Sequence, residues 1–240
     1  AISQKKDAPK WTTNCNSVIF FSYFFTSQRH DRRSFIKTYW GGLLEEMDKM
    51  GLHTSWLHLH VTDKEKISRA DGNQMLKELS DSPVHLGKHS FIQSFTSFKV
   101  LFKVIKLWRC LISKESEFAS LDLIGQSCIN QALWLLNKKD LTNSLIGPAA
   151  VSSLIWIETF DAALKQLPHY SKGFYLCENQ PWERALTMAW RKNCCGRLVA
   201  VPHATLRFWD TRYFYDRRSF HSEYVKRFPF PDLIAANSRV

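Results

Sequence analysis

Apolar runs alternate with helical patterns at the start of this chain, and this order constrains its fold more than any other feature. Residues 17–24 form an apolar run rich in aromatic side chains, and residues 54–61 include Trp56, Leu57, Leu59 and Val61, which predicts two strands, the first of them buried. Each run precedes a segment with helical spacing of its apolar residues, over 34–50 and over 62–79. Strands that alternate with helices are typical of a parallel sheet. The sequence therefore predicts an α/β fold, a Rossmann-like parallel sheet flanked by helices.

The pattern changes in the middle of the chain. Helical runs predominate between about residues 91 and 167, and no strand is predicted there. These runs cover 91–113, 118–137 and 148–167. Strand-like runs then return at 173–177, 197–201 and 232–236. We expect one domain over 17–240 with a helical insertion at about 91–167, preceded by a frayed polar segment at 1–16.

The net charge of +11 implies attraction to something anionic. Nucleic acid, a membrane surface and a phosphorylated substrate all satisfy it, although motifs for nucleic acid binding are missing and no nucleic acid is expected. The six cysteines show no CxxC spacing, which predicts reduced thiols in a cytosolic compartment. No apolar run is long enough to cross a bilayer. We therefore expect a cytoplasmic protein.

A carboxylate stands at the end of one predicted strand. Glu178 follows the apolar run 173–177, and Pro181 stands where a helix can begin. Ligands of open α/β sheets bind at the carboxyl ends of the strands. Glu178 is therefore a candidate catalytic residue, a general base that takes a proton from an acceptor hydroxyl. The alternative is a structural carboxylate that accepts the free N–H groups of the helix.

The residues next to Glu178 also have two interpretations. Trp182 can stack on a sugar or serve as a core anchor. Glu183 can bind substrate, but a charge favoured by the helix dipole, or a partner for an arginine, is the simpler role. Asn179 and Gln180 complete the substrate-binding candidates at this strand end.

A second polar group follows the neighbouring predicted strand, 197–201. His203 can bind a phosphate or orient a hydroxyl, and a partly buried structural histidine is equally consistent. The arginines beyond it alternate with aromatic residues, which suits a phosphorylated substrate or a solvated basic surface. Asp210 is most simply a salt-bridge partner of one of these arginines. The substrate-binding candidates here are His203, Thr205, Arg207, Trp209, Asp210 and Arg212. We expect the two strand ends to share one cleft.

The helical run 91–113 is basic and amphipathic. Lys99, Lys103 and Lys106 fall on one helical face beside a broad apolar surface. Such a helix can lie on the anionic inner leaflet of a membrane. The alternative is an ordinary packed helix whose lysines face water.

Four stretches of the chain carry distinctive motifs, and the pattern extends to residues 231–237. They are Phe20-Phe21-Ser22-Tyr23-Phe24 followed by Tyr39-Trp40-Gly41; Trp56-Leu57-His58; Glu178-Asn179-Gln180 with Trp182-Glu183 and Ala185-Leu186; and Val201-Pro202-His203-Ala204-Thr205 with Arg207-Phe208-Trp209-Asp210 and Arg212-Tyr213-Phe214. Together they resemble a bacterial family described as surface carbohydrate biosynthesis proteins, which look like glycosyltransferases of the two-Rossmann-domain GT-B type.

The resemblance implies transfer of a sugar from a nucleotide-activated donor to a glycan or lipid-linked acceptor, in surface polysaccharide or lipopolysaccharide synthesis at the cytoplasmic face of the inner membrane. It also implies that the chain is the N-terminal, acceptor-side half of a GT-B architecture, inactive without a C-terminal donor domain. The expected co-substrate is a nucleotide sugar. Such enzymes usually need no bound metal, and no bound cofactor is expected. The resemblance does not itself assign the catalytic residues, and our hypothesis is that Glu178 acts as base while His203 and Arg207 orient substrate or stabilise charge.

Two other functions fit the same residues. One is a non-catalytic glycan-binding or scaffold module of the same pathway, with a degenerate site. The other is nucleic acid binding, which is supported only by the positive charge and by the alternating arginines and aromatic residues of 207–218.

Overall fold

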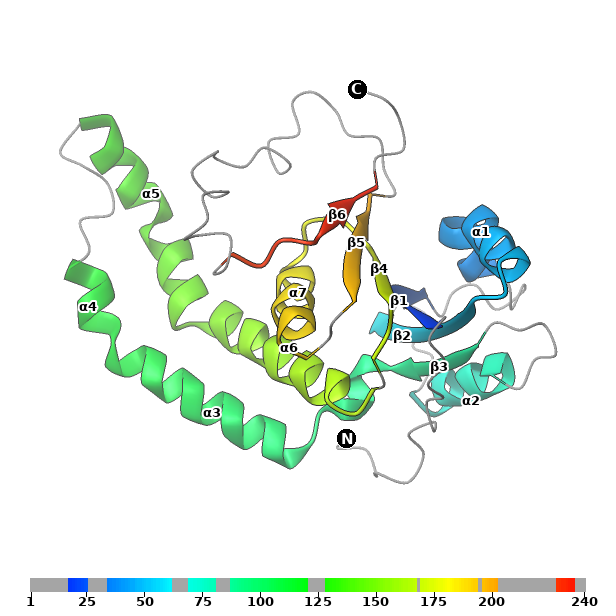
Figure 1. Cartoon of the computed structure of the whole chain (residues 1–240). Coiled ribbons are helices and arrows are strands. Elements are labelled where there is room, and N and C mark those ends of the chain that lie inside the picture. The colour runs from blue at the N-terminus through cyan, green and yellow to red at the C-terminus, as the bar shows by residue number, and fades with distance from the viewer. Residues whose placement is uncertain are drawn as a thin grey trace.

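A parallel sheet of six strands forms the centre of the molecule, in the order β3-β2-β1-β4-β5-β6 (Figure 1). The computed structural model describes residues 17–25, 34–61, 69–80, 87–120, 128–167, 169–193, 196–202 and 228–235. The strands are β1 (Ser17–Phe25), β2 (His53–Val61), β3 (Lys88–Phe91), β4 (Lys172–Leu176), β5 (Arg197–Val201) and β6 (Leu233–Ile234). All five neighbouring pairs are parallel. The predicted Rossmann-like α/β fold is confirmed.

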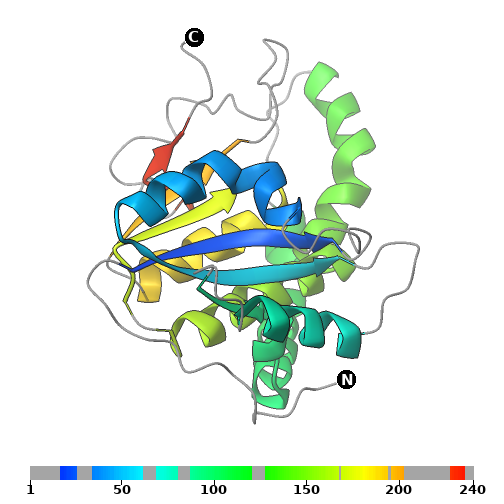
Figure 2. The ribbon, with the colours of Figure 1, turned by 90° about the vertical axis from the view of Figure 1, so that its right-hand side faces the viewer.

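Helices cover both faces of this sheet. The described helices are α1 (Ser34–Lys49), α2 (Arg69–Ser80), the 3-10 helix η2 (Ile92–Phe95), α3 (Phe98–Ser113), α4 (Glu115–Ser120), α5 (Cys128–Leu145), α6 (Pro148–Leu164) and α7 (Pro181–Asn193). Figure 2 looks onto the face covered by α1 and α2, with α6 and α7 behind the sheet. In Figure 1, α3 lies outside α6, away from the sheet. None of the described helices is long and apolar enough to cross a bilayer.

β1 lies in the middle of the sheet and is buried on both faces. Ile19 and Phe21 pack with α6 and α7, whereas Val18 and Phe20 pack with α1 and α2. Each of these four side chains is at most 2% exposed. A strand that is covered on both faces needs apolar residues at most positions, and the buried Ser22 is accommodated because its hydroxyl accepts a hydrogen bond from Trp40 Nε1 at 3.2 Å.

β3 is a strand that the sequence does not reveal. Its residues Lys88, His89 and Ser90 are polar, yet His89 and Ser90 are buried. His89 pairs with His58 of β2 through a contact of 2.9 Å between Nδ1 and Nε2, and the two rings stack with centroids 5.2 Å apart. Because each histidine gives the other a polar partner, the strand can be buried without an apolar pattern.

The segment between β3 and β4 is helical where it is described, as the sequence predicts. The predicted runs 91–113 and 148–167 correspond to α3 and α6. The middle run, 118–137, differs, because α4 ends at Ser120 and α5 continues to Leu145.

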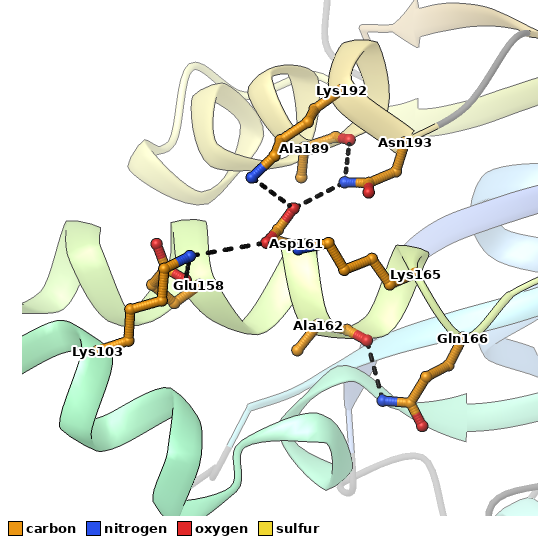
Figure 3. A network of polar contacts seen from close by, with 9 residues as sticks. All are labelled: Lys103, Glu158, Asp161, Ala162, Lys165, Gln166, Ala189, Lys192 and Asn193. Atoms are coloured by element: carbon orange, nitrogen blue, oxygen red, sulfur yellow. Dashed lines mark hydrogen bonds and ion pairs between the residues drawn. The ribbon is translucent and has the colours of Figure 1, made fainter.

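A polar network joins α3, α6 and α7 around Asp161 (Figure 3). Asp161, on α6, is 5% exposed and forms ion pairs with Lys165 at 2.6 Å and with Lys192 of α7 at 3.2 Å. Asn193 Nδ2 donates to the same carboxylate at 2.8 Å. Burial raises the pKa of Asp161, but the hydrogen bonds from Lys165, Asn193 and Lys192 outweigh it and bring the pKa to about 2.

The same network reaches α3 through one lysine. Lys103 Nζ lies 2.5 Å from Glu158 and 3.8 Å from Asp161. Lys103 is therefore a structural cation that fastens α3 to α6.

Candidate functional site

The order of the strands creates a topological switch between β1 and β4. From β1 the chain moves to β2 and β3 on one side, and β4, β5 and β6 follow on the other side. In open parallel sheets, ligands bind outside the carboxyl ends of the strands at such a switch. Side chains at the ends of β1 and β4 are therefore the first candidates for a functional site.

Tyr23 and Glu178 come together at this switch. Phe21 of β1 pairs with Tyr175 of β4, and both Tyr23 and Glu178 lie within three residues of that pair. The Tyr23 hydroxyl forms a hydrogen bond with the Glu178 carboxylate. Trp182 Nε1 donates to the same hydroxyl at 2.8 Å. Because the indole N–H can only donate, the tyrosine proton is directed to the carboxylate.

Tyr23 is held in a neutral, hydrogen-donating state. Burial raises the pKa of Tyr23 above its ordinary value of 10.0, the hydrogen bond from Trp182 lowers it, and the charge and hydrogen bond of Glu178 raise it further. The net shift is upward. Trp182 is 4% exposed and packs edge-on against the Tyr23 ring, with centroids 5.7 Å apart. The tyrosine is thus fixed in position by packing as well as by hydrogen bonds.

Glu183 caps the N-terminus of α7. Its Oε1 accepts the backbone N–H of Glu178 at 2.7 Å and that of Gln180 at 2.9 Å. Glu183 is the third residue of α7, the position from which a capping-box glutamate reaches back. The capping role that the sequence leaves open for Glu178 therefore belongs to Glu183.

The Glu183 carboxyl group is buried, with 3% of the residue exposed. Burial raises the pKa of Glu183, and the backbone hydrogen bonds from Gln180 and Glu178 oppose that rise without cancelling it. Burial and the charge of Glu183 also raise the pKa of the neighbouring Cys177 thiol to about 12. Cys177 therefore stays protonated at neutral pH and is not a candidate nucleophile.

Asn179 adopts a left-handed backbone conformation, with φ of 61°. Asparagine accepts this conformation more readily than other residues with a side chain, apart from aspartate. The turn lets the chain pass from β4 to α7 within residues 177–180. Backbone strain of this kind is concentrated at functional sites, so it supports the assignment of a site to this turn.

The structure brings together only part of the predicted site. Glu178 and Trp182 meet at the switch, but Trp182 is a buried anchor that contacts Tyr23. The Gln180 side chain is exposed, and Asn179 is half-buried. Tyr23 is a candidate site residue that the sequence did not single out, although it lies in the first of the four motif stretches, 20–24, and near the end of a predicted strand.

The second half of the predicted site lies outside the described residues. His203, Thr205, Arg207, Trp209, Asp210 and Arg212 all fall in the range 203–227, which the structure does not describe. The strands that lead to the two halves, β4 and β5, are neighbours, as the sequence predicts. Beyond that range, residues 228–230 pack on α7, where Arg184 donates to the Pro229 carbonyl at 3.1 Å and lies over the Phe230 ring.

Comparison with known proteins adds little to this geometry. No family model matches the chain, and no curated protein matches it. A short-chain dehydrogenase from Oenococcus oeni PSU-1 with a solved crystal structure is similar over 79% of this chain and 81% of its own, with 12% identity and a TM-score of 0.28. Among the described residues, no three His, Cys, Asp or Glu side chains gather in a way that could hold a metal ion.

Proposed function

We propose that this chain is the acceptor-side domain of a glycosyltransferase and that Glu178 is its general base. The observation that carries the proposal is the hydrogen bond between Glu178 and Tyr23, made across the topological switch between β4 and β1. A base must lie where the ligand binds and must be oriented by its neighbours. Two observations support the role of Glu178: it follows β4 at the carboxyl edge of the sheet, and Glu183 rather than Glu178 accepts the backbone N–H groups at the start of α7.

In the proposed reaction, a hydroxyl group of a glycan or lipid-linked acceptor gives its proton to the Glu178 carboxylate. The hydroxyl oxygen forms a bond to the anomeric carbon of the donor sugar. The bond from that carbon to the phosphate oxygen of the nucleotide breaks, and the nucleoside diphosphate leaves with the electron pair. Tyr23, which stays protonated, holds one side of the carboxylate in place.

The charge of the protein is consistent with a substrate that carries phosphates. A net charge of +11 attracts nucleotide sugars and phosphate-bearing acceptors. The strand order alone would also suit a dinucleotide, but that class uses a glycine-rich turn after the first strand. No glycine occurs between Phe25 and Ser34 in this sequence. A sugar nucleotide therefore suits the chain better than a dinucleotide does.

Turnover measured in the full-length protein tests the proposal. Nucleotide sugars would be screened with lipid-linked and soluble glycan acceptors, and the active pair would then be assayed with Glu178→Gln. We expect kcat to fall roughly 100-fold or more, because general base catalysis contributes about that much, while circular dichroism and acceptor affinity stay unchanged. A variant that retains full turnover would remove Glu178 from the mechanism.

The same assay separates the proposal from a scaffold function. A protein that binds glycan acceptor but turns over no nucleotide sugar would be a binding module of the pathway. In that case Glu178→Gln would change acceptor affinity or nothing at all.

A further inference from the structure

Helix α3 presents a row of large apolar side chains to the solvent. Phe98 is 64% exposed, Phe102 is 72% exposed, and Ile105 is 48% exposed. Ile112 continues the row and is 38% exposed. Their spacing of four, three and seven residues places them along one side of the helix. Single exposed apolar residues are common on protein surfaces, but a contiguous row marks a surface that is covered in use.

The opposite side of α3 already has a structural role. Val100 and Val104 are buried, and α3 packs along α6. The ion pair between Lys103 and Glu158 also holds α3 against α6 (Figure 3). The helix therefore cannot rotate to bury the apolar row, which we call the α3 stripe (Phe98, Phe102, Ile105 and Ile112).

Exposed cations accompany the α3 stripe. Lys99, Lys106 and Arg109 are exposed, and α3 contains no acidic residue. Within the described part of the chain, no ion pair engages any of these three cations. By helical geometry, Arg109 lies within the stripe, and the two lysines lie along one edge of it. The only α3 lysine that is neutralised by a carboxylate in the described residues is Lys103.

We propose that the α3 stripe rests on the surface of an anionic lipid bilayer. Phe98, Phe102 and Ile105 would enter the boundary between headgroups and acyl chains, and Lys99 and Lys106 would contact lipid phosphates. A second copy of this face is a poor occupant, because like charges would oppose each other. The helix is about 24 Å long at 1.5 Å per residue, which suits a segment that lies in the plane of the bilayer. This inference does not depend on the proposed activity.

Vesicle binding tests the inference with the intact protein. The probes are vesicles of phosphatidylcholine alone and of phosphatidylcholine mixed with phosphatidylglycerol, and binding is measured by flotation at several salt concentrations. We expect binding to the mixed vesicles only, weakening as salt rises. The double variant Lys99→Glu/Lys106→Glu should weaken binding by at least about tenfold. Phe102→Ser should weaken it by about tenfold, because it removes one inserted ring.

Matched controls keep charge and polarity changes comparable. Lys138→Glu/Lys139→Glu makes the same change in net charge on exposed residues of α5. Met50→Ser removes an apolar side chain that is 69% exposed and lies away from α3. Both controls should bind within about threefold of the unchanged protein. All substituted side chains are exposed, so thermal melting should be the same for every variant.

Several results would overturn the inference. Equal binding to neutral and anionic vesicles would do so, and so would equal losses in the α3 and α5 charge variants, which would indicate diffuse attraction by net charge. A concentration-dependent dimer in sedimentation velocity that Phe102→Ser dissociates would assign the stripe to a second copy of the chain instead.

Discussion

The Glu183 carboxylate lies 2.7 Å from the backbone nitrogen of Glu178, so one glutamate holds the backbone that presents the other. The two acids have different environments. Glu183 is buried and bonded to backbone N–H groups, whereas Glu178 is half-buried and bonded to the Tyr23 hydroxyl. Removing the Glu183 carboxylate should therefore destabilise the fold, whereas removing the Glu178 carboxylate should impair the proposed reaction.

Glu183→Ala should destabilise the protein by about 1–3 kcal/mol, because the half-buried N–H groups of Glu178 and Gln180 would lose their acceptor. Glu178→Ala should cost less than about 1 kcal/mol, since its carboxylate is partly solvated. Urea unfolding followed by circular dichroism measures both. The assignment of the cap would be wrong if Glu178→Ala proved the more damaging change.

The pH dependence of stability provides a separate check on Glu183. Its folded-state pKa is raised above the ordinary value of 4.5, so the folded protein holds this proton more tightly than the unfolded chain does. The resulting stability is fully present below pH 4.5 and is lost as the pH rises through the folded pKa. Glu183→Gln keeps an acceptor oxygen but cannot titrate. The variant should show a flatter stability profile above pH 4.5, and an unchanged profile would contradict the raised pKa.

Asp161 should give the opposite behaviour. Its pKa falls from 3.8 to about 2 on folding, so its contribution is present above pH 3.8 and is lost as the pH falls toward 2. Asp161→Asn should reduce the free energy of unfolding at neutral pH by on the order of 2 kcal/mol. The difference between variant and unchanged protein should shrink in acid. Unfolding titrations from neutral pH to pH 2 would show this convergence, and a constant difference would rule out the ionised carboxylate as its source.

Tyr23→Phe should separate positioning from folding. The ring and its edge-on packing against Trp182 remain, but the hydroxyl is lost, and with it both the hydrogen bond to Glu178 and the one that Trp182 Nε1 donates, so some loss of stability is also expected. If Glu178 is the base, we expect kcat to fall by about tenfold with little change in KM, because the base would be less well oriented. A pure loss of stability with normal kinetics would indicate a structural tyrosine.

A pair of glycine substitutions should have opposite effects. A Cβ atom on Gly173, in the central strand β4, would lie 2.8 Å from the buried Trp190 ring. Gly173→Ala should therefore destabilise the protein by about 1–3 kcal/mol. Among the described residues, nothing lies within 4 Å of the equivalent position on Gly42 of α1. Gly42→Ala should stabilise the protein by about 0.5–1 kcal/mol, as measured by thermal unfolding.

The strands that could be predicted are those whose apolar pattern is continuous. β1 and β2 agree with the predicted runs to within one residue, at Phe25 and His53, because buried parallel strands carry apolar residues on both faces. β3 could not be predicted, since its burial depends on the pairing of His89 with His58 on another strand. Pairing between distant polar residues leaves no periodic signal in the sequence.

The candidate site could be predicted from one side only. The strand end and the helix start around Glu178 are local features, and the structure confirms α7 from Pro181. The partner Tyr23 is 159 residues away from Trp182, with which it shares a hydrogen bond, and only the sheet order brings them together. The cap is made by Glu183 and not by Glu178 because of the turn at Asn179. The backbone angle of that turn has no reliable signature in a single sequence.

Helix α7 is held at both ends. Glu183 ties its first turn to the site loop, and Lys192 and Asn193 tie its last turn to Asp161 of α6, about 20 Å away at 1.5 Å per residue. Because α3 also packs against α6, contacts connect α3, through α6 and α7, to the turn at the carboxyl end of β4. If α3 rests on a membrane, these contacts would fix the distance and orientation of Glu178 relative to the bilayer surface.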